Sequence, residues 1–203
     1  MALVDMERTA VPAGGIRTLN RGARGRLRSA ARDSSAARWG LATVLLLMAY
    51  EWLLSGLDKI LSGGFAGGLA PNLRAALKDN PNRWYVHFVT RVIVPNAHAT
   101  AVLIEAGEIL VALGLIAGAA WWLIGARLPA SWALALRLGG VGALIGSALM
   151  TANYYLLAGN TLPWLNTVNP FNEGLSIDGL LTLVALALVV VHLFARGEIG
   201  DSR

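Results

Sequence analysis

Two glutamates stand three positions apart inside a long apolar run, in the segment LIEAGEIL at residues 103–110. On a helix this spacing puts Glu105 and Glu108 on one face, because residues three or four apart are surface neighbours. A third glutamate, Glu51, lies in another apolar run and is followed by Lys59. Carboxyl groups in such surroundings can transfer protons, and a lysine can neutralise them. These residue types therefore predict proton transfer or the binding of a small anion.

The composition indicates that these apolar runs cross a membrane. Hydrophobic residues make up 56% of the 203 residues and charged residues only 14%, whereas an ordinary soluble domain is about a quarter charged. Four stretches reach the roughly 20 residues that a helix needs to cross a hydrocarbon core. They cover about residues 39–61, 99–124, 133–157 and 177–194. Since backbone in lipid must satisfy its own hydrogen bonds, we predict an all-α integral membrane protein, a four-helix bundle within residues 39–195.

A basic segment of different composition precedes the first span. Residues 1–38 hold eight arginines and three acidic residues, and their net charge of +5 equals that of the whole chain. We expect a disordered tail that contacts anionic lipid headgroups, and no binding of nucleic acid. Lysines and arginines number twelve on the side of the two termini and five on the other. Both termini, including the short tail at residues 196–203, are therefore predicted on the cytoplasmic side of the cell membrane.

The loop between the first two spans, residues 62–98, is longer than a connection requires. It opens with SGGFAGG, which is typical of a flexible hinge. Apolar residues then recur in pairs every four positions, at Trp84, Tyr85, Phe88, Val89, Val92 and Ile93. This pattern predicts an amphipathic helix that lies in the membrane interface or folds over the mouth of the bundle. A plain loop with some aromatic residues is the alternative.

Each predicted span carries one stripe of small or polar residues, and we expect the stripes to face one another. In antiparallel helices Glu51 and Glu108 both lie about 15 Å deep in a core about 30 Å thick. A charge there costs about 2.5–3.5 kcal/mol, so these carboxyl groups must face inward, carry protons or be paired. We predict a polar pocket with Glu108, Glu105 and Glu51 as catalytic residues, and with Lys59, Ser55, Asp58, Asn153, Asp178, His98 and Arg91 as substrate-binding residues. A hydrogen-bonded plug that fixes helix register is the alternative.

Other residue types limit the chemistry and suggest how the helices pack. The chain has no cysteine, which excludes thiol carriers, thiolate-bound zinc and iron–sulfur ligation within it. The three histidines are scattered, so we predict no metal site and no bound cofactor. Two pairs of glycines four residues apart, Gly114 with Gly118 and Gly142 with Gly146, are expected to let helices approach closely.

The segments that hold these residues resemble a known family. WLLSGLDKILSGGFAGGLAPNL ends the first span with small residues and a lysine. NPNRWYVHFVTRVIVPNAHATAVLIEAGEILVALGLIAG carries a glutamate before a glycine-rich apolar stretch. Both look like the DoxX/DoxD family, and ANYYLLAGN near the end of the third span resembles its DoxD branch. The resemblance covers about residues 38–195.

This resemblance implies a small membrane subunit of a thiosulfate:quinone oxidoreductase. Such a subunit takes part in oxidising thiosulfate to tetrathionate, passes electrons to a diffusible quinone and works with a second, DoxA-like subunit. Gly56, Lys59 and Glu108 are the residues that match the family pattern. We therefore predict a subunit of a quinone-linked oxidoreductase acting on a reduced sulfur compound. The alternatives are a non-catalytic membrane anchor or scaffold of a redox complex, and a carrier of small molecules or protons; the oligomeric state stays open.

Overall fold

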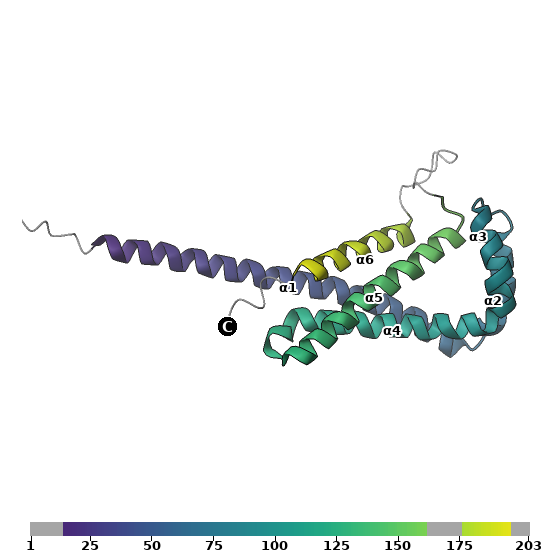
Figure 1. Cartoon of the computed structure of the whole chain (residues 1–203), viewed down its shortest axis with the longest axis horizontal. Coiled ribbons are helices and arrows are strands. Elements are labelled where there is room, and N and C mark those ends of the chain that lie inside the picture. The colour runs from purple at the N-terminus through teal and green to yellow at the C-terminus, as the bar shows by residue number, and fades with distance from the viewer. Residues whose placement is uncertain (1–13, 162–175, 196–203) are drawn as a thin grey trace, which may run out of the picture. The chain divides into compact units, whose positions relative to one another are not determined.

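A computed structural model describes residues 14–161 and 176–195, with side chains from residue 35 onward, and these residues form helices and turns without a strand (Figure 1). The helices are α1 (Gly14–Ser62), α2 (Phe65–Leu77), α3 (Arg83–Phe88), a π-helical turn (Val89–Ile93), a 3-10 turn (Val94–Asn96), α4 (Ala97–Ile124), a 3-10 turn (Gly125–Arg127), α5 (Ala130–Leu157) and α6 (Ile177–Phe194). Contacts divide the chain into two units, Met1–Gly40 and Leu41–Arg203.

The first unit differs from the tail that we predicted. Its backbone is helical from Gly14 onward and continues into the first span, whereas we expected residues 1–38 to be disordered. Arginine and alanine supply twelve of residues 14–40, and both favour helix. Extending an existing helix also avoids the cost of nucleating a new one. Residues 1–13 lie outside the described part of the chain.

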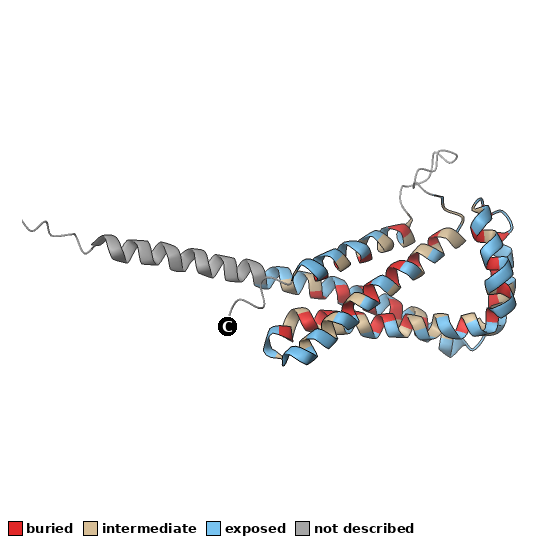
Figure 2. Ribbon diagram, in the orientation of Figure 1, coloured by how far each residue is buried: buried red, intermediate tan, exposed pale blue. Residues whose placement is uncertain are grey.

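Within the described residues, four helical segments are long and apolar enough to cross a membrane, which confirms the predicted four-helix membrane bundle. They are Ser35–Ser62, Arg83–Arg127, Ala130–Leu157 and Ile177–Phe194. Figure 2 shows buried residues in stripes along the helices of the second unit, with exposed residues on the other faces. Large apolar side chains occupy those exposed faces; Leu47, Leu103 and Leu149 are 65%, 72% and 61% exposed. The chain is therefore a multi-pass membrane protein whose outer surface suits lipid.

Helices α4 and α5 cross where glycines leave room. A Cβ added at Gly118 would lie 3.1 Å from the Cα of Gly140, and one added at Gly140 would lie 2.7 Å from the Cα of Gly118. A Cβ at Gly114 would lie 2.9 Å from the carbonyl oxygen of Gly139. The expectation for Gly114 and Gly118 is thus confirmed, because small residues let helices approach closely in lipid.

The glycines that we predicted on α5 do not form this crossing. A Cβ at Gly142 would meet no atom within 4 Å, and one at Gly146 would meet only a side-chain carbon of Val111, at 3.2 Å. The buried face of α5 instead contains Gly140, Leu144, Ser147 and Thr151. Gly142 lies two residues after Gly140, so it points about 200° around the helix from the crossing.

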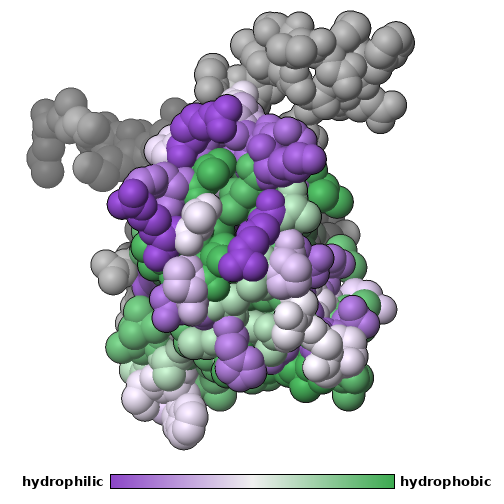
Figure 3. Space-filling model, turned by 90° about the vertical axis from the view of Figure 1, so that its right-hand side faces the viewer, coloured by the Kyte–Doolittle hydropathy of each residue, from purple (hydrophilic) through white to green (hydrophobic). Residues whose placement is uncertain are grey.

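Two helical segments, Phe65–Leu77 and Arg83–Asn96, form a cap at the end of the bundle where α4 begins and α5 ends (Figure 1). The apolar side of α2, at Leu69, Leu73 and Leu77, packs in one cluster with residues of the second segment and with the first turns of α4. The second segment is helical as predicted, but α3 gives way to π-helical and 3-10 turns, and of the predicted apolar residues Tyr85 and Val89 are buried while Trp84, Phe88 and Val92 are exposed. From the capped end, hydrophilic side chains surround an apolar strip, as expected near a membrane boundary (Figure 3).

Helix α2 was missed because we read all of SGGFAGG as a hinge. The turn itself is short: Gly63 has a positive φ of 64°, and α2 begins two residues later at Phe65. The glycines inside α2 lower its intrinsic helix stability. The leucines at four-residue spacing offset this effect, because they bury one side of α2 against the bundle.

Asn80 ties the cap to the end of α5. Its side chain is 3% exposed, and its amide nitrogen donates to the carbonyl oxygens of Leu156 at 2.7 Å and Leu157 at 3.2 Å. The last carbonyls of a helix have no partner within the helix, so this amide supplies one. The hydroxyl of Tyr85 adds a bond of 3.2 Å to the carbonyl of Asn153. The cap is therefore held to α5 by polar bonds as well as by apolar packing.

Replacing Gly140 by alanine should destabilise the bundle. The new Cβ would press on backbone atoms of Gly118, which cannot move aside cheaply. We expect the free energy of unfolding to fall by about 1–3 kcal/mol, measured by denaturant unfolding of the purified protein in detergent. Gly142→Ala on the same helix is the matched control and should leave stability unchanged. Equal stability of the two variants would contradict the observed crossing.

Candidate functional site

A buried ion pair joins α1 to α4. The Nζ atom of Lys59 lies 2.8 Å from both carboxylate oxygens of Glu108. The side chain of Glu108 is 0% exposed and that of Lys59 is 21% exposed. Lys59 also donates to the hydroxyl oxygen of Ser55 at 2.6 Å, and the hydroxyl of Tyr154 donates to Oε1 of Glu108 at 2.7 Å. Side chains from α1 and α5 therefore meet the carboxylate of α4 inside the bundle.

Local helix geometry explains how Lys59 reaches this position. Ser55 and Lys59 are four residues apart and share one face of α1. Gly56 lets that face approach α4: a Cβ added there would lie 3.2 Å from the Cβ of Glu108 and 2.9 Å from Cδ1 of Ile109. A larger residue at this position would push the helices apart and lengthen the ion pair. The residues that match the family pattern, Gly56, Lys59 and Glu108, thus lie together.

Phe65, the first residue of α2, lies on the other side of the lysine. The Nζ atom of Lys59 is 5.5 Å from the centre of the Phe65 ring, a distance at which the ring attracts a cation. The bonds to Ser55 and Glu108 and this aromatic contact surround most of the ammonium group. In an apolar environment a paired and hydrogen-bonded charge is far less costly than a lone one. The ion pair is therefore compatible with the membrane interior.

Glu51 does not lie in this site, which corrects the prediction that it faces inward beside Glu108. It is exposed on α1, and Gly56, five residues later, is the residue of α1 that lies against Glu108. Our depth argument assumed that α1 ends level with the start of α4. Instead the first turns of α4 are buried in the cap cluster through Ala97 and Ala101. From the helix rise, α4 extends about 7 Å further into the cap than α1 does.

The other predicted residues also lie outside the ion pair. His98, Arg91 and Asp58 are exposed, and Glu105 and Asp178 are half-buried. The Asn153 amide donates to the Leu149 carbonyl at 2.8 Å, within its own helix. Among the described residues, none of these six side chains bonds to Lys59, Glu108 or Tyr154. Glu105 is one turn closer to the cap than Glu108, so Lys59 pairs with the deeper carboxylate only.

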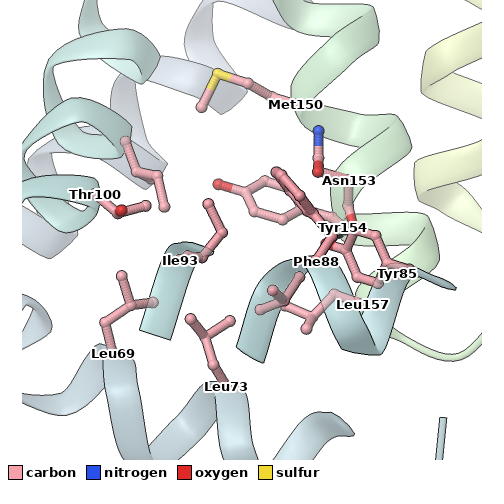
Figure 4. Close-up of a pocket in the computed structure, with 12 residues that line it drawn as sticks. Leu69, Leu73, Tyr85, Phe88, Ile93, Thr100, Met150, Asn153, Tyr154 and Leu157 are labelled. Carbon is pink, nitrogen blue, oxygen red and sulfur yellow. Dashed lines mark hydrogen bonds between the residues drawn. The ribbon is translucent and has the colours of Figure 1, made fainter. Parts of the chain in front are cut away.

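An apolar pocket lies between the cap, α4 and α5 (Figure 4). Its cavity volume is about 200 Å³. In Figure 4 the side chains of Leu69 and Leu73 approach from α2, while Tyr85, Phe88 and Tyr154 contribute aromatic rings. Tyr154 belongs to both features, because its ring lines the pocket and its hydroxyl bonds Glu108. This residue links the pocket to the ion pair.

Tyr154 is a residue of this site that the sequence analysis did not single out. A tyrosine near the end of a span commonly anchors it at the membrane boundary, so the residue type gives no signal of another role. Its helical neighbours on α5, Thr151 and Ala158, give no signal of a carboxylate partner 46 residues away. The aromatic and hydroxyl parts of tyrosine suit a position between an apolar pocket and a charge, but that position depends on how α4 and α5 cross.

A second buried polar cluster joins α4, α5 and α6 around His192, which is 0% exposed. The Nε1 atom of Trp122 donates to Nε2 of His192 at 3.0 Å, since an indole nitrogen can only donate. Nδ1 of the histidine therefore carries the hydrogen that bonds the Leu188 carbonyl at 2.9 Å. Arg137 donates to the backbone oxygen of His192 at 2.7 Å. With both ring nitrogens bonded, this histidine holds helices together, and no cluster of potential metal ligands occurs in the described ranges.

Removing one partner of the ion pair should destabilise the protein more than removing both. Lys59→Met would leave a buried carboxylate without its cation, at a cost of about 3–5 kcal/mol. Adding Glu108→Gln to that variant should recover part of the loss, because the amide is uncharged and still accepts from Tyr154. Denaturant unfolding in detergent of the single and double variants gives the coupling energy. Glu105→Gln is the control and should change stability little; additive effects of the two site substitutions would contradict a direct pair.

Comparisons with known proteins provide no relative from which a family could be assigned. The sequence matches no protein-family model, and neither the curated proteins nor the solved structures yield a match. The resemblance to the DoxX/DoxD family therefore stays a prediction that rests on the motifs quoted above. What the structure establishes is an all-α bundle of membrane-length helices in which Lys59 and Glu108 form a buried ion pair beside an apolar pocket.

Proposed function

We propose that the chain is a membrane subunit of a quinone-linked oxidoreductase, and that the pocket beside Tyr154 binds the quinone headgroup. The observation that carries the proposal is the position of Tyr154. Its ring lines an apolar pocket, and its hydroxyl bonds a carboxylate that is paired with a lysine. A polar group that can exchange a proton thus stands at the wall of a site suited to a lipid-soluble ring.

The pocket is large enough to hold one ring but too small for a whole lipid. A dry cavity of about 150 Å³ lined by apolar side chains can hold benzene, and the volume here is about 200 Å³. Sites for larger, drug-sized ligands span roughly 300–1,000 Å³. The headgroup of a quinone therefore fits, while its isoprenoid tail remains in the surrounding lipid. Leucine, isoleucine, valine and aromatic side chains around the cavity match the apolar faces of such a ring.

The ion pair supplies the proton chemistry in this proposal. Reduction of a quinone to a quinol takes up two electrons and two protons. Tyr154 gives a proton to the reduced headgroup oxygen and recovers one from Lys59 through the carboxylate of Glu108. The side chain of Lys59, which is 21% exposed, then takes a proton from water. Two such cycles deliver the two protons that one quinone takes up on reduction to a quinol.

The electron donor is assigned to a partner. The chain has no cysteine that could carry sulfur, and the charge of Lys59 is matched by Glu108 rather than left for an anion. The resemblance to the DoxX/DoxD family supplies the substrate class, a reduced sulfur compound such as thiosulfate. We therefore assign its binding to a DoxA-like or other redox subunit, or to a surface shared with it. The quinone is a diffusible acceptor in this scheme, and no resident cofactor is required of this chain.

We also propose the orientation that the charges favour. Both termini lie on the cytoplasmic side of the cell membrane, because the twelve lysines and arginines on that side outnumber the five on the other. The cap then faces the outer side. Lys59, in the last turn of α1 near the cap, would take protons from that side.

A non-catalytic scaffold is the second candidate, and one observation favours it. No buried side-chain nitrogen or oxygen in the described residues lacks a hydrogen-bond partner. A fully bonded ion pair is also what fixes one helix against another in a structural bundle. In that case Lys59 and Glu108 set the helix register, and the chain holds a redox partner in the membrane. Replacement of the Tyr154 hydroxyl separates the two candidates.

Tyr154→Phe should abolish turnover without unfolding the protein. The ring that lines the pocket is kept and only the hydroxyl is lost, so we expect a fall of about 100-fold or more in rate, as for loss of a general acid. The measurement is thiosulfate-dependent quinone reduction by the purified chain in lipid, with and without candidate partner subunits. Tyr155→Phe is the matched control, because that hydroxyl bonds the carbonyl of Thr161 and not Glu108.

The outcomes of this assay distinguish the two candidates. Equal rates for the native chain and Tyr154→Phe would overturn the role of the hydroxyl. Reduction that is absent with every partner, from a native chain that still assembles with that partner, would instead support the scaffold.

Filling the pocket should block quinone binding. Leu73→Trp puts a bulky indole ring into the cavity between α2 and α5 in place of the smaller leucine side chain. We expect the affinity for a short-chain benzoquinone to fall at least tenfold, which is about 1.4 kcal/mol, in calorimetric titrations of the protein in lipid nanodiscs. Leu61→Trp, at an 81% exposed position at the end of α1, is the control. Unchanged affinity in folded Leu73→Trp would move the quinone elsewhere.

A further inference from the structure

One face of α1 carries carboxylates among exposed apolar side chains. Its members follow at alternating intervals of four and three residues: Leu47, Glu51, Leu54, Asp58 and Leu61. All five are exposed, and the leucines are 65%, 47% and 81% exposed in chain order. Among the described residues, neither carboxylate forms a hydrogen bond or an ion pair. We call this set of five residues the acidic seam.

The depth of Glu51 makes this exposure unfavourable in lipid alone. Glu51 stands eleven residues before Ser62, the end of α1, which is about 16 Å along the helix axis. That distance is close to half of a hydrocarbon core about 30 Å thick. Ionisable groups at such depth almost always face protein or a water-filled cavity rather than lipid. The bundle itself does not cover Glu51, so another element must.

The spacing of the acidic seam indicates what covers it. Alternating steps of four and three residues repeat every seven, which is the pattern of a helix that packs along another helix. The other exposed face of α1, through Leu46 and Leu57, is apolar and suits lipid. The acidic seam therefore has the geometry of a helix–helix interface, with carboxylates at two of its five positions.

Charge complementarity selects the kind of helix. Pairing with a parallel second copy would put Glu51 opposite Glu51 and Asp58 opposite Asp58, where like charges repel. Within the described bundle, Lys59 is already paired with Glu108, and Arg137 on α5 bonds the backbone oxygen of His192. Arg74, Lys78 and Arg91 belong to the cap, and Arg127 to the turn after α4.

We propose that the acidic seam docks a transmembrane helix of a partner protein that carries lysine or arginine at two positions seven residues apart. Its cations would pair with Glu51 and Asp58, while its apolar residues pack on the three leucines. A deeply placed cation is as costly in lipid as Glu51 is, so docking removes two unfavourable exposures at once. This inference does not depend on the proposed quinone chemistry, because the acidic seam contains none of the residues of that site.

The test uses a synthetic transmembrane helix as the probe. The helix is built from leucine and alanine with two lysines seven residues apart, and a matched helix has leucine at both positions. Since the chain has no cysteine, Asp79→Cys in the exposed cap gives a single site for a donor dye. Energy transfer to an acceptor on the helix is measured in zwitterionic vesicles for the full chain and for Glu51→Gln with Asp58→Asn. Glu105→Gln is the control for loss of a carboxylate elsewhere.

We expect the two-lysine helix to bind at least tenfold more tightly than the leucine helix. This preference should vanish in the double variant and persist in Glu105→Gln, with all proteins shown to be folded by circular dichroism. Equal binding of the two helices to the native chain would overturn the proposal. Transfer between differently labelled copies of the chain that depends on Glu51 would also overturn it, because the seam would then be a self-association surface.

Discussion

The cost of charge in lipid is the constraint on which this structure depends. Glu108 lies in the middle of a membrane-length helix and is fully buried, so it needs a partner inside the bundle. Lys59 meets that need only if α1 passes close to α4, which the absence of a side chain at Gly56 allows. The ion pair and the glycine beside it therefore act together, and the relative position of the first two spans follows from both.

The cap and the crossing of α4 with α5 extend this arrangement into a site. Gly118 and Gly140 bring the two helices together, and Asn80 binds the free carbonyls at the end of α5. Tyr154 is thereby held with its hydroxyl on Glu108 and its ring in the pocket wall. A pocket suited to an apolar ring is thus connected to a group that can exchange protons, and this connection is the basis of the proposed quinone site. At the opposite face of α1 the same cost of charge leads to a different conclusion, because Glu51 has no partner within the bundle.

Sequence reasoning succeeded where one helix or one pair of residues carried the signal. Apolar length identified the spans, helix periodicity identified the segment Arg83–Asn96, and the need to neutralise a deep carboxylate put Lys59 in the site. It failed for Glu51, because equal depth was inferred from span ends that are not level. It also failed for Tyr154 and Asn80, whose partners are 46 and 76 residues away and leave no local pattern.

The sequence by itself determined the class of structure. Long apolar runs in a chain with few charges can only satisfy their backbone in lipid as helices, so an all-α membrane bundle follows from composition and length. Only the tertiary structure decided which polar residues face inward. Successive residues of a helix point 100° apart, and five residues span about 7 Å along the axis. The hydropathy of a single helix encodes neither its rotation nor its axial shift. Both depend on where glycines let neighbouring helices touch. Glu108 is therefore buried and paired, while Glu51 is exposed.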